Sequence, residues 1–257
     1  MTSALERPAN WPMGISLIHR DTVESTNDVA CELAADGADD GTVIWADMQT
    51  KGRGRRGRNW VSPKGNLYCS TILRPNKPPQ EAAQISLLAA IALGDALCAL
   101  LPDTVAVQHK WPNDVLVDGG KIAGILLESA GGGMGRTVDW LVLGCGVNVV
   151  SHPEDTLYPA THMTAHDPSV TAAAVLTGFV TRLLIWRDEW NLKGMTPLRQ
   201  AWLDRAKGLG DEIIVRSATT ETMGRFLDLD DDGALMLERP DGTVIRIAAG
   251  DVFFEGP

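Results

Sequence analysis

The sequence of 257 residues lacks several features that would place it in a specialised class of protein. No run approaches eighteen consecutive apolar residues, so no transmembrane helix is predicted. The first residues contain no apolar core of the kind found in signal peptides, which leads us to expect a cytoplasmic protein. No C-x-x-C pair occurs. All four cysteines lie in apolar segments, so we expect reduced core thiols at Cys31, Cys69, Cys98 and Cys145.

Common nucleotide-binding and metal-binding motifs are missing as well. No Gly-Lys-Ser/Thr triplet occurs, which excludes a P-loop. His162 and His166 are four residues apart, but they lie in a loop-like stretch without a nearby cysteine, so no metal held by protein ligands is predicted. The formal net charge is −10, and no broad basic face is evident. We therefore do not expect the protein to bind a nucleic-acid duplex.

One short segment departs from this acidic background. Residues 51–58 contain five cationic side chains, three glycines and no acid. Glycine lets backbone N–H groups approach phosphate oxygens, and arginine adds planar, bidentate donors. The segment is therefore suited to a small polyanion such as a nucleoside triphosphate. Its glycines also spell G-x-G-x-x-G, but Asn59-Trp60-Val61-Ser62-Pro63 follows, which is unsuited to the helix that a dinucleotide-binding turn requires.

The predicted elements alternate between strand and helix at first and are all strands at the end. Residues 209–257 carry eleven acids against four arginines, and this shift marks a boundary. We predict an α+β fold, with a mixed β-sheet and helices in residues 1–208 and a small β-barrel in residues 209–257. Short joints between the strands of residues 105–147 predict antiparallel pairing. The expected strands are 15–19, 42–48, 67–73, 105–111, 115–117, 121–129, 138–147 and five within 212–254; the expected helices are 26–35, 81–101, 170–190 and 197–207.

Three further strings present polar groups in unusual settings. Ser25-Thr26-Asn27 offers small donors and acceptors at a strand-to-helix turn, where a plain helix cap is the alternative. Asn113 and Asp114 present an amide and a carboxylate side by side, although such residues also favour turns.

The third string places a single lysine at the start of an apolar strand. Lys121 precedes the small residues Ala123 and Gly124, which suggests a ligand close to the backbone; a solvated lysine at a strand edge is the alternative. Gly144-Cys145-Gly146-Val147-Asn148 ends the next strand with an amide.

In combination these strings resemble the signatures of the biotin–protein ligase family, also called biotin–[acetyl-CoA-carboxylase] ligases. The resemblance covers residues 25–148, and the tail looks like the family's SH3-like barrel. It implies the class II synthetase-like catalytic fold shared by biotin and lipoate ligases. The strings that carry it are Gly52-Arg53-Gly54-Arg55-Arg56-Gly57, Lys110-Trp111-Pro112-Asn113-Asp114 and Gly120-Lys121-Ile122-Ala123-Gly124-Ile125-Leu126.

The resemblance implies a two-step reaction that uses ATP with Mg²⁺. Biotin would first form biotinyl-5′-AMP and then pass to a lysine of the biotin carboxyl carrier protein of acetyl-CoA carboxylase. Some family members carry an N-terminal DNA-binding domain, and we expect none here because about fourteen residues precede the first predicted strand. A homodimer is possible within the family, and no membrane or nucleic-acid partner is expected.

The same resemblance implies roles for individual residues. Asp114 is expected either to place Mg²⁺ or to orient Lys121, and the sequence does not choose between these. The implied catalytic residues are Lys121, Arg55 and Arg53. Those implied to bind biotin are Ser25, Thr26, Asn27, Gln49, Gly52, Arg53, Gly54, Arg55, Lys121 and Gly124, and those implied to bind ATP are Arg55, Arg56, Arg58, Trp60, Asn113, Asp114, Lys121 and Asn148.

Two other functions compete with this interpretation. A lipoate–protein ligase shares the fold type and the adenylation chemistry but normally carries a different glycine-rich string. A nucleotide- or RNA-binding module would keep the basic loop without catalysis. Retention of Lys121 and Asn113 favours an enzyme over such a module.

Overall fold

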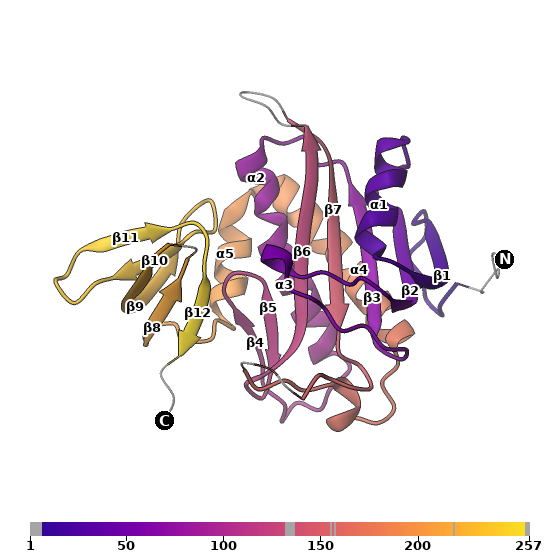
Figure 1. The fold of residues 1–257 in the computed structure, drawn as a ribbon. Helices are drawn as coiled ribbons and strands as arrows, with labels where there is room; N and C mark the ends of the chain where they lie inside the picture. The colour runs from indigo at the N-terminus through magenta and orange to yellow at the C-terminus, as the bar shows by residue number, and fades with distance from the viewer. Residues whose placement is uncertain (1–6, 132–136, 155, 157, 218, 255–257) are drawn as a thin grey trace.

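The computed structural model describes residues 7–131, 137–154, 156, 158–217 and 219–254. Part of the N-terminal stretch on which the signal-peptide expectation depends lies outside this range. Two β-sheets dominate the described chain (Figure 1). The larger has seven strands, in the order β1 (Leu17–Val23), β2 (Val43–Gln49), β3 (Leu67–Leu73), β7 (Val138–Val147), β6 (Gly120–Gly131), β5 (Asp114–Val117) and β4 (Val107–Lys110). The smaller has five, in the order β11 (Val244–Ile247), β10 (Leu235–Glu238), β9 (Glu221–Leu229), β8 (Glu212–Arg216) and β12 (Asp251–Phe254).

The larger sheet is mixed, as predicted. Only β1 and β2 run parallel, and every other neighbouring pair in it is antiparallel. The strand β3 is buried along its whole length, because it lies near the middle and its aromatic and β-branched residues suit a sheet covered on both faces.

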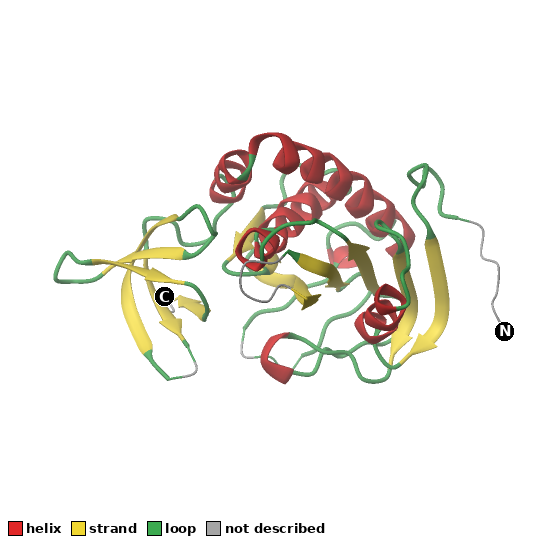
Figure 2. Cartoon of the chain, turned by 90° about the horizontal axis from the view of Figure 1, so that it is seen from above, coloured by secondary structure: helices red, strands yellow, loops and turns green. Residues whose placement is uncertain are grey.

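Helices cover the two faces of this sheet unequally. The short helix α1 (Thr26–Ala35) packs Ala30 and Ala34 on one face, against side chains of β2, β3 and β7. The other face carries α3 (Ile85–Cys98) and α4 (Ala172–Lys193), which pack on each other (Figure 2). One face therefore remains open beside α1, and the polar strings gather there.

The predicted helix 81–101 is two helices, α2 (Pro79–Ala83) and α3, separated by Gln84. The Gln84 amide accepts a hydrogen bond from Trp190 Nε1 at 2.7 Å and donates one to the Asp231 carbonyl at 2.8 Å. Helix-favouring residues lie on both sides of Gln84, so the sequence pattern carries no sign of the break. The segment Pro79–Cys98 is long and apolar enough to cross a membrane, but 72% of its most apolar window is buried inside the protein, as expected of a core helix.

The expectation of four buried cysteines was wrong for two of them. Cys69 and Cys145 are buried, whereas Cys31 is half-buried and Cys98 is exposed. Cys98 is the last residue of α3, at the point where the helix leaves the core. The continuous apolar pattern of α3 concealed this, because it does not show where the helix reaches the surface.

The tail folds into five strands, as predicted, and these strands, expected as a small β-barrel, form one antiparallel sheet. Tight turns with positive φ at Gly233 and Gly242 separate β9, β10 and β11. The core of this sheet joins that of the larger one, because Trp202 of α5 (Met195–Leu203) packs edge-to-face against Phe226, with ring centres 6.3 Å apart. The division of function at residue 208 remains a prediction.

Candidate active site

A cavity of about 320 Å³ opens on the face of the larger sheet that carries α1. Most of the side chains singled out in the sequence meet there, although they come from segments far apart in the chain. Gly52 and Arg56 belong to the same loop but do not line the cavity. The predicted residues that do line it are Ser25, Thr26, Asn27, Gln49, Arg53, Gly54, Arg55, Arg58, Trp60, Asn113, Asp114, Lys121, Gly124 and Asn148.

The floor of the cavity is formed by glycines of two neighbouring strands, which have no side chains there. Gly124 of β6 lies directly opposite Gly146 of β7, and the Trp60 ring covers both. A Cβ atom added at Gly146 would lie 2.6 Å from Trp60 Nε1, and one at Gly124 would lie 3.2 Å from the same ring. Glycine is therefore required here by the close approach of an aromatic ring to the sheet.

One end of the cavity is a chain of buried hydrogen bonds at the start of α1. The backbone N–H and the hydroxyl of Thr26 both donate to Gln49 Oε1, at 2.8 and 3.1 Å. Ser70 Oγ lies 2.8 Å from Thr26 Oγ1 and 2.6 Å from Asn27 Oδ1. Ser25 occupies the cap position, but its side chain makes no capping hydrogen bond, so its hydroxyl is left for the cavity.

The glycine-arginine loop closes on itself at the edge of the cavity. Arg53 pairs with Asn59 in an isolated bridge, and the Gly54 N–H donates to the Arg58 carbonyl at 2.7 Å. The Arg53 guanidinium turns toward acids, at 2.6 Å from Asp28 and 3.2 Å from Glu128. The hydrogen bond to Asp28 raises the pKa of Arg53.

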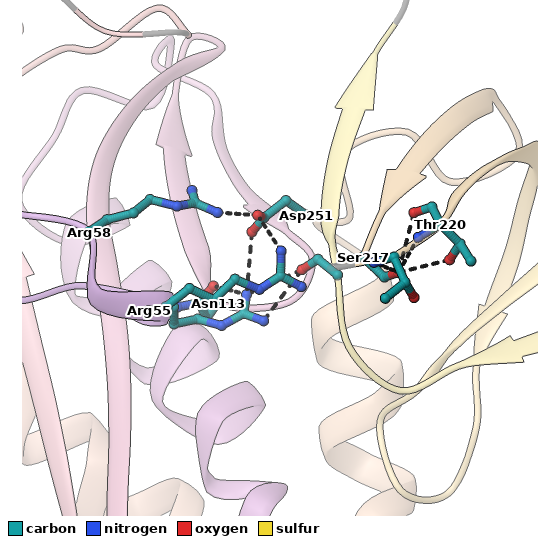
Figure 3. A network of polar contacts seen from close by, with 9 residues as sticks. Arg55, Arg58, Asn113, Ser217, Thr220 and Asp251 are labelled. Carbon is teal, nitrogen blue, oxygen red and sulfur yellow. Dashed lines mark hydrogen bonds and ion pairs between the residues drawn. The ribbon is translucent and has the colours of Figure 1, made fainter.

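The other three arginines of the loop converge on one carboxylate of the C-terminal sheet (Figure 3). Asp251 of β12 lies 3.7 Å from Arg55 and 3.1 Å from Arg56, and it also pairs with Arg58. Arg55 additionally donates to the Gly250 carbonyl at 3.4 Å. Burial lowers the pKa of Arg55, and Asp251 opposes this. The C-terminal sheet thus closes one side of the site with a negative charge.

Lys121 is paired rather than solvated. Its Nζ lies 2.6 Å from Asp114 Oδ1 and 5.5 Å from the centre of the Trp60 ring. Its backbone is held by residues 159–161, because the Lys121 N–H donates to the Pro159 carbonyl at 2.7 Å. Asp114 is therefore close enough to orient the Lys121 ammonium.

Both asparagines hold the walls in position. The Asn113 amide accepts from Arg55 Nη1 at 3.1 Å and donates to the Ile125 carbonyl, which ties the arginine loop to β6. Asn148 donates to the Thr161 carbonyl at 3.1 Å.

Several residues of the site were missed in the sequence. Asp251 belongs to no motif, and only the folding of the tail against the loop brings it to the arginines. Tyr158 lines the cavity from a stretch without regular structure. Glu128 had a readable signal: it lies four residues after Gly124 on one strand, so its side chain points to the face on which Gly124 borders the cavity.

Comparison with known proteins identifies the arrangement. Residues 20–148 match the model of the "Biotin/lipoate A/B protein ligase family", and residues 208–255 match the "Biotin protein ligase C terminal domain". The chain is 41% identical to the biotin–[acetyl-CoA-carboxylase] ligase of Paracoccus denitrificans over 239 residues, covering 91% of this chain and 98% of that protein. The chain belongs to the biotin protein ligase family.

Solved structures of this family share the fold. The biotin protein ligase of Aquifex aeolicus in complex with biotin and ATP aligns with a TM-score of 0.78 and 26% identity, over 93% of this chain and 97% of that one. The Leishmania major biotin protein ligase in complex with biotinyl-5-AMP aligns with a TM-score of 0.63 and 26% identity, over 93% and 100% of the two chains.

Proposed function

We propose that this chain is a biotin–protein ligase that forms biotinyl-5′-AMP from biotin and ATP. It then transfers biotin to a lysine of the biotin carboxyl carrier domain of acetyl-CoA carboxylase. One observation carries this: a single cavity joins a buried hydroxyl–amide end at Ser25 and Gln49 to a cationic end at Arg55 and Lys121. The first end suits a neutral polar ring, and the second suits a carboxylate and phosphates.

In the first step, an oxygen of the biotin carboxylate attacks the α-phosphorus, and the bond from that phosphorus to pyrophosphate breaks. Both reactants are anionic, so the step depends on neutralising their encounter. Lys121 is our choice to bridge the carboxylate and an α-phosphate oxygen. Its ion pair with Asp114 and its backbone hydrogen bond to the Pro159 carbonyl support this role, because they hold the ammonium in place before the substrates arrive.

In the second step, the neutral amine of the acceptor lysine attacks the acyl carbon of the adenylate. The bond from that carbon to AMP breaks, an amide forms, and the amine proton leaves to solvent. Until the acceptor arrives, water must be kept from the adenylate. We propose that the loop of residues 52–58 closes over it, with Arg55 and Arg58 exchanging Asp251 for phosphate oxygens.

The remaining assignments follow the lining of the cavity. We place the biotin ring against Ser25, Thr26, Asn27 and Gln49, and the nucleotide against Trp60, Asn113 and Asn148. Arg53 is already held by Asp28 and Glu128, so we assign it to shaping the loop beside the biotin arm. Residues 1–208 would then do the chemistry, with residues 209–257 closing one side. Dimerisation stays a prediction.

Magnesium fits the oxygen donors of this site. Mg²⁺ usually binds through one or two carboxylates together with phosphates and water. Asp114 and Asp251 both line the cavity and are the carboxylates that would hold it. When bound, the ion would offset part of the triphosphate charge. In the structure these two carboxylates are paired with Lys121 and with arginines, so binding the ion would require them to be shared or released.

The test is pyrophosphate release from ATP and Mg²⁺ with biotin, with lipoate or with neither. Release that requires biotin, followed by transfer of label to a carrier domain, supports the proposal. Release that requires lipoate would assign the chain to the other branch of its family model. Absence of release with both acids would show that the cavity is a binding site without this activity.

A further inference from the structure

A second lysine lies beside the cavity and has no role in the mechanism above. Lys110 is the last residue of β4, and its side chain is buried, with the residue 6% exposed. Its Nζ lies 3.8 Å from the centre of the Tyr158 ring and 5.9 Å from that of Phe254. Tyr158 lines the cavity, so the ammonium lies directly behind the cavity wall.

The strand register places Lys110 on the face of the sheet that bears the cavity. Lys110 lies directly opposite Asp114, Asp114 opposite Gly124, and Gly124 opposite Gly146. Directly opposed residues of antiparallel strands point to the same face. The lysine therefore ends a row that begins on the glycine floor and continues past Asp114 toward the C-terminal sheet.

Lys110 differs from the other cations of the site in its partners. Lys121 has Asp114, the three arginines of the loop share Asp251, and Arg53 has Asp28 and Glu128. Within the described parts of the chain, the Lys110 ammonium forms no ion pair and instead makes cation–π contacts with two aromatic rings. A buried ammonium is costly without an anion, and a cation–π contact compensates only part of that cost. An anionic ligand would complete its environment.

The local charge balance shows which anion fits. Around this end of the cavity, Arg55, Arg56, Arg58, Lys121 and Lys110 face Asp114 and Asp251, so five cations oppose two carboxylates and leave a net +3. Without Lys110 the net charge would be +2. A polyphosphate is the anion of matching size and charge, and burial lowers the pKa of Lys110, which a bound phosphate would raise again.

We propose that Lys110 is a binding residue for the two terminal phosphates of the nucleotide and for the pyrophosphate that leaves. This rests on the proposed function, in which Lys121 serves the α-phosphate. In the row of opposed residues, Lys110 lies on the far side of Asp114 from the glycine floor. Its ammonium would therefore contact the β- and γ-phosphates, which are the phosphates farther from biotin. Four rotatable bonds let Nζ exchange the Tyr158 ring for phosphate oxygens.

The test compares Lys110→Met, which keeps the stem and removes the charge, with Lys110→Arg and with Lys207→Met. Lys207 is the matched control: its Nζ lies 5.6 Å from the Phe254 ring, much as that of Lys110 does, but among the described residues it makes no cation–π contact with Tyr158 of the cavity wall. Calorimetry measures the binding of magnesium pyrophosphate and of magnesium ATP to each folded variant, with melting temperature as the check on folding. We expect Lys110→Met to weaken both about 10- to 100-fold, Lys110→Arg to stay within a few-fold of the wild type, and Lys207→Met to leave both unchanged.

Equal affinity of Lys110→Met and the wild type for pyrophosphate would overturn the proposal, as would an equal loss in Lys207→Met. If Lys110→Met fails to fold, Lys110→Gln replaces it in the same comparison. Biotin binding supplies a further readout, because a role in phosphate binding leaves it unchanged, whereas general damage to the cavity weakens it. Failure of the proposed function is separate: the wild type would then bind these phosphates without biotin-dependent pyrophosphate release.

Discussion

Replacing Lys121 by Met removes the one ammonium group that we place between the two anionic reactants. The side chain of Lys121 is 29% exposed and that of its partner Asp114 is 18% exposed, so a surface-like effective dielectric constant applies. At ~4 Å, and with an effective dielectric constant near 20, one charge pair is worth about 4 kcal/mol. If this stabilisation is realised mainly in the transition state, the adenylation rate falls ~10³-fold.

The assay is biotin-dependent pyrophosphate release under single-turnover conditions, with the melting temperature of each variant measured alongside. Lys193→Met is the control, because Lys193 forms an exposed pair with Glu189 on α4, at 2.7 Å. We expect no change of rate there, since exposed pairs contribute about 0–1 kcal/mol to stability.

The double variant Lys121→Met/Asp114→Asn separates chemistry from stability. The single variant Lys121→Met leaves the Asp114 carboxylate without its partner, which destabilises the fold. Asn at position 114 removes that charge, so we expect recovery of the melting temperature while the rate stays far below that of the wild type. A rate within threefold of the wild type in Lys121→Met, with the fold intact, would refute the reasoning.

Four further predictions follow from the geometry. Asp251→Asn removes an anion that competes with phosphate for three arginines, so ATP without Mg²⁺ should bind several-fold more tightly by calorimetry; equal or weaker binding would show that this carboxylate does not compete with phosphate. Gly146→Ala places a methyl group against Trp60 and should raise the KM for ATP about tenfold or destabilise the fold by about 1–3 kcal/mol, and unchanged values of both would count against the packed floor. Trypsin should cleave within residues 53–58 more slowly when biotin and ATP are present, and equal cleavage in both states would rule out closure of the loop. Burial lowers the pKa of His109 to about 4, so the folded state binds fewer protons than the unfolded state between pH 6.5 and 4. Stability should therefore fall by about 3 kcal/mol as the pH drops through that window, measured by urea unfolding, whereas His109→Gln should lack this component.

Local chemistry explains which parts of the fold were predictable. The strands of residues 105–147 are joined by short turns, so their antiparallel pairing follows from the lengths of the joints. The turns at Gly233 and Gly242 follow from Asp-Gly pairs between apolar runs. Helix α1 begins at Thr26 and ends at Ala35, as predicted from a small polar residue before it and Gly37 after it.

Features that depend on distant contacts were not predictable. Gln84 separates α2 from α3, and its amide hydrogen-bonds to Trp190 and Asp231, which lie far along the chain. The same holds for Asp251, whose meeting with the arginine loop depends on how the C-terminal sheet packs.

The candidate site was partly readable for a related reason. Residue type revealed the loop, the lysine and the asparagines, because few other roles need those groups at that spacing. It did not reveal their partners in the folded protein. The sequence carried no sign that acids from α1 and β6 hold Arg53, whose predicted contact with the adenylate stays a prediction, and it indicated no role for Lys110.

The most direct test of the central claim is a crystal structure of the protein grown with biotin, ATP and Mg²⁺. The account predicts biotinyl-5′-AMP in the cavity, with its ring at Ser25 and Gln49, its acyl phosphate at Lys121 and its adenine beside Trp60. Density for either substrate at another place on the protein, with this cavity still closed by Arg55 and Asp251, would contradict it.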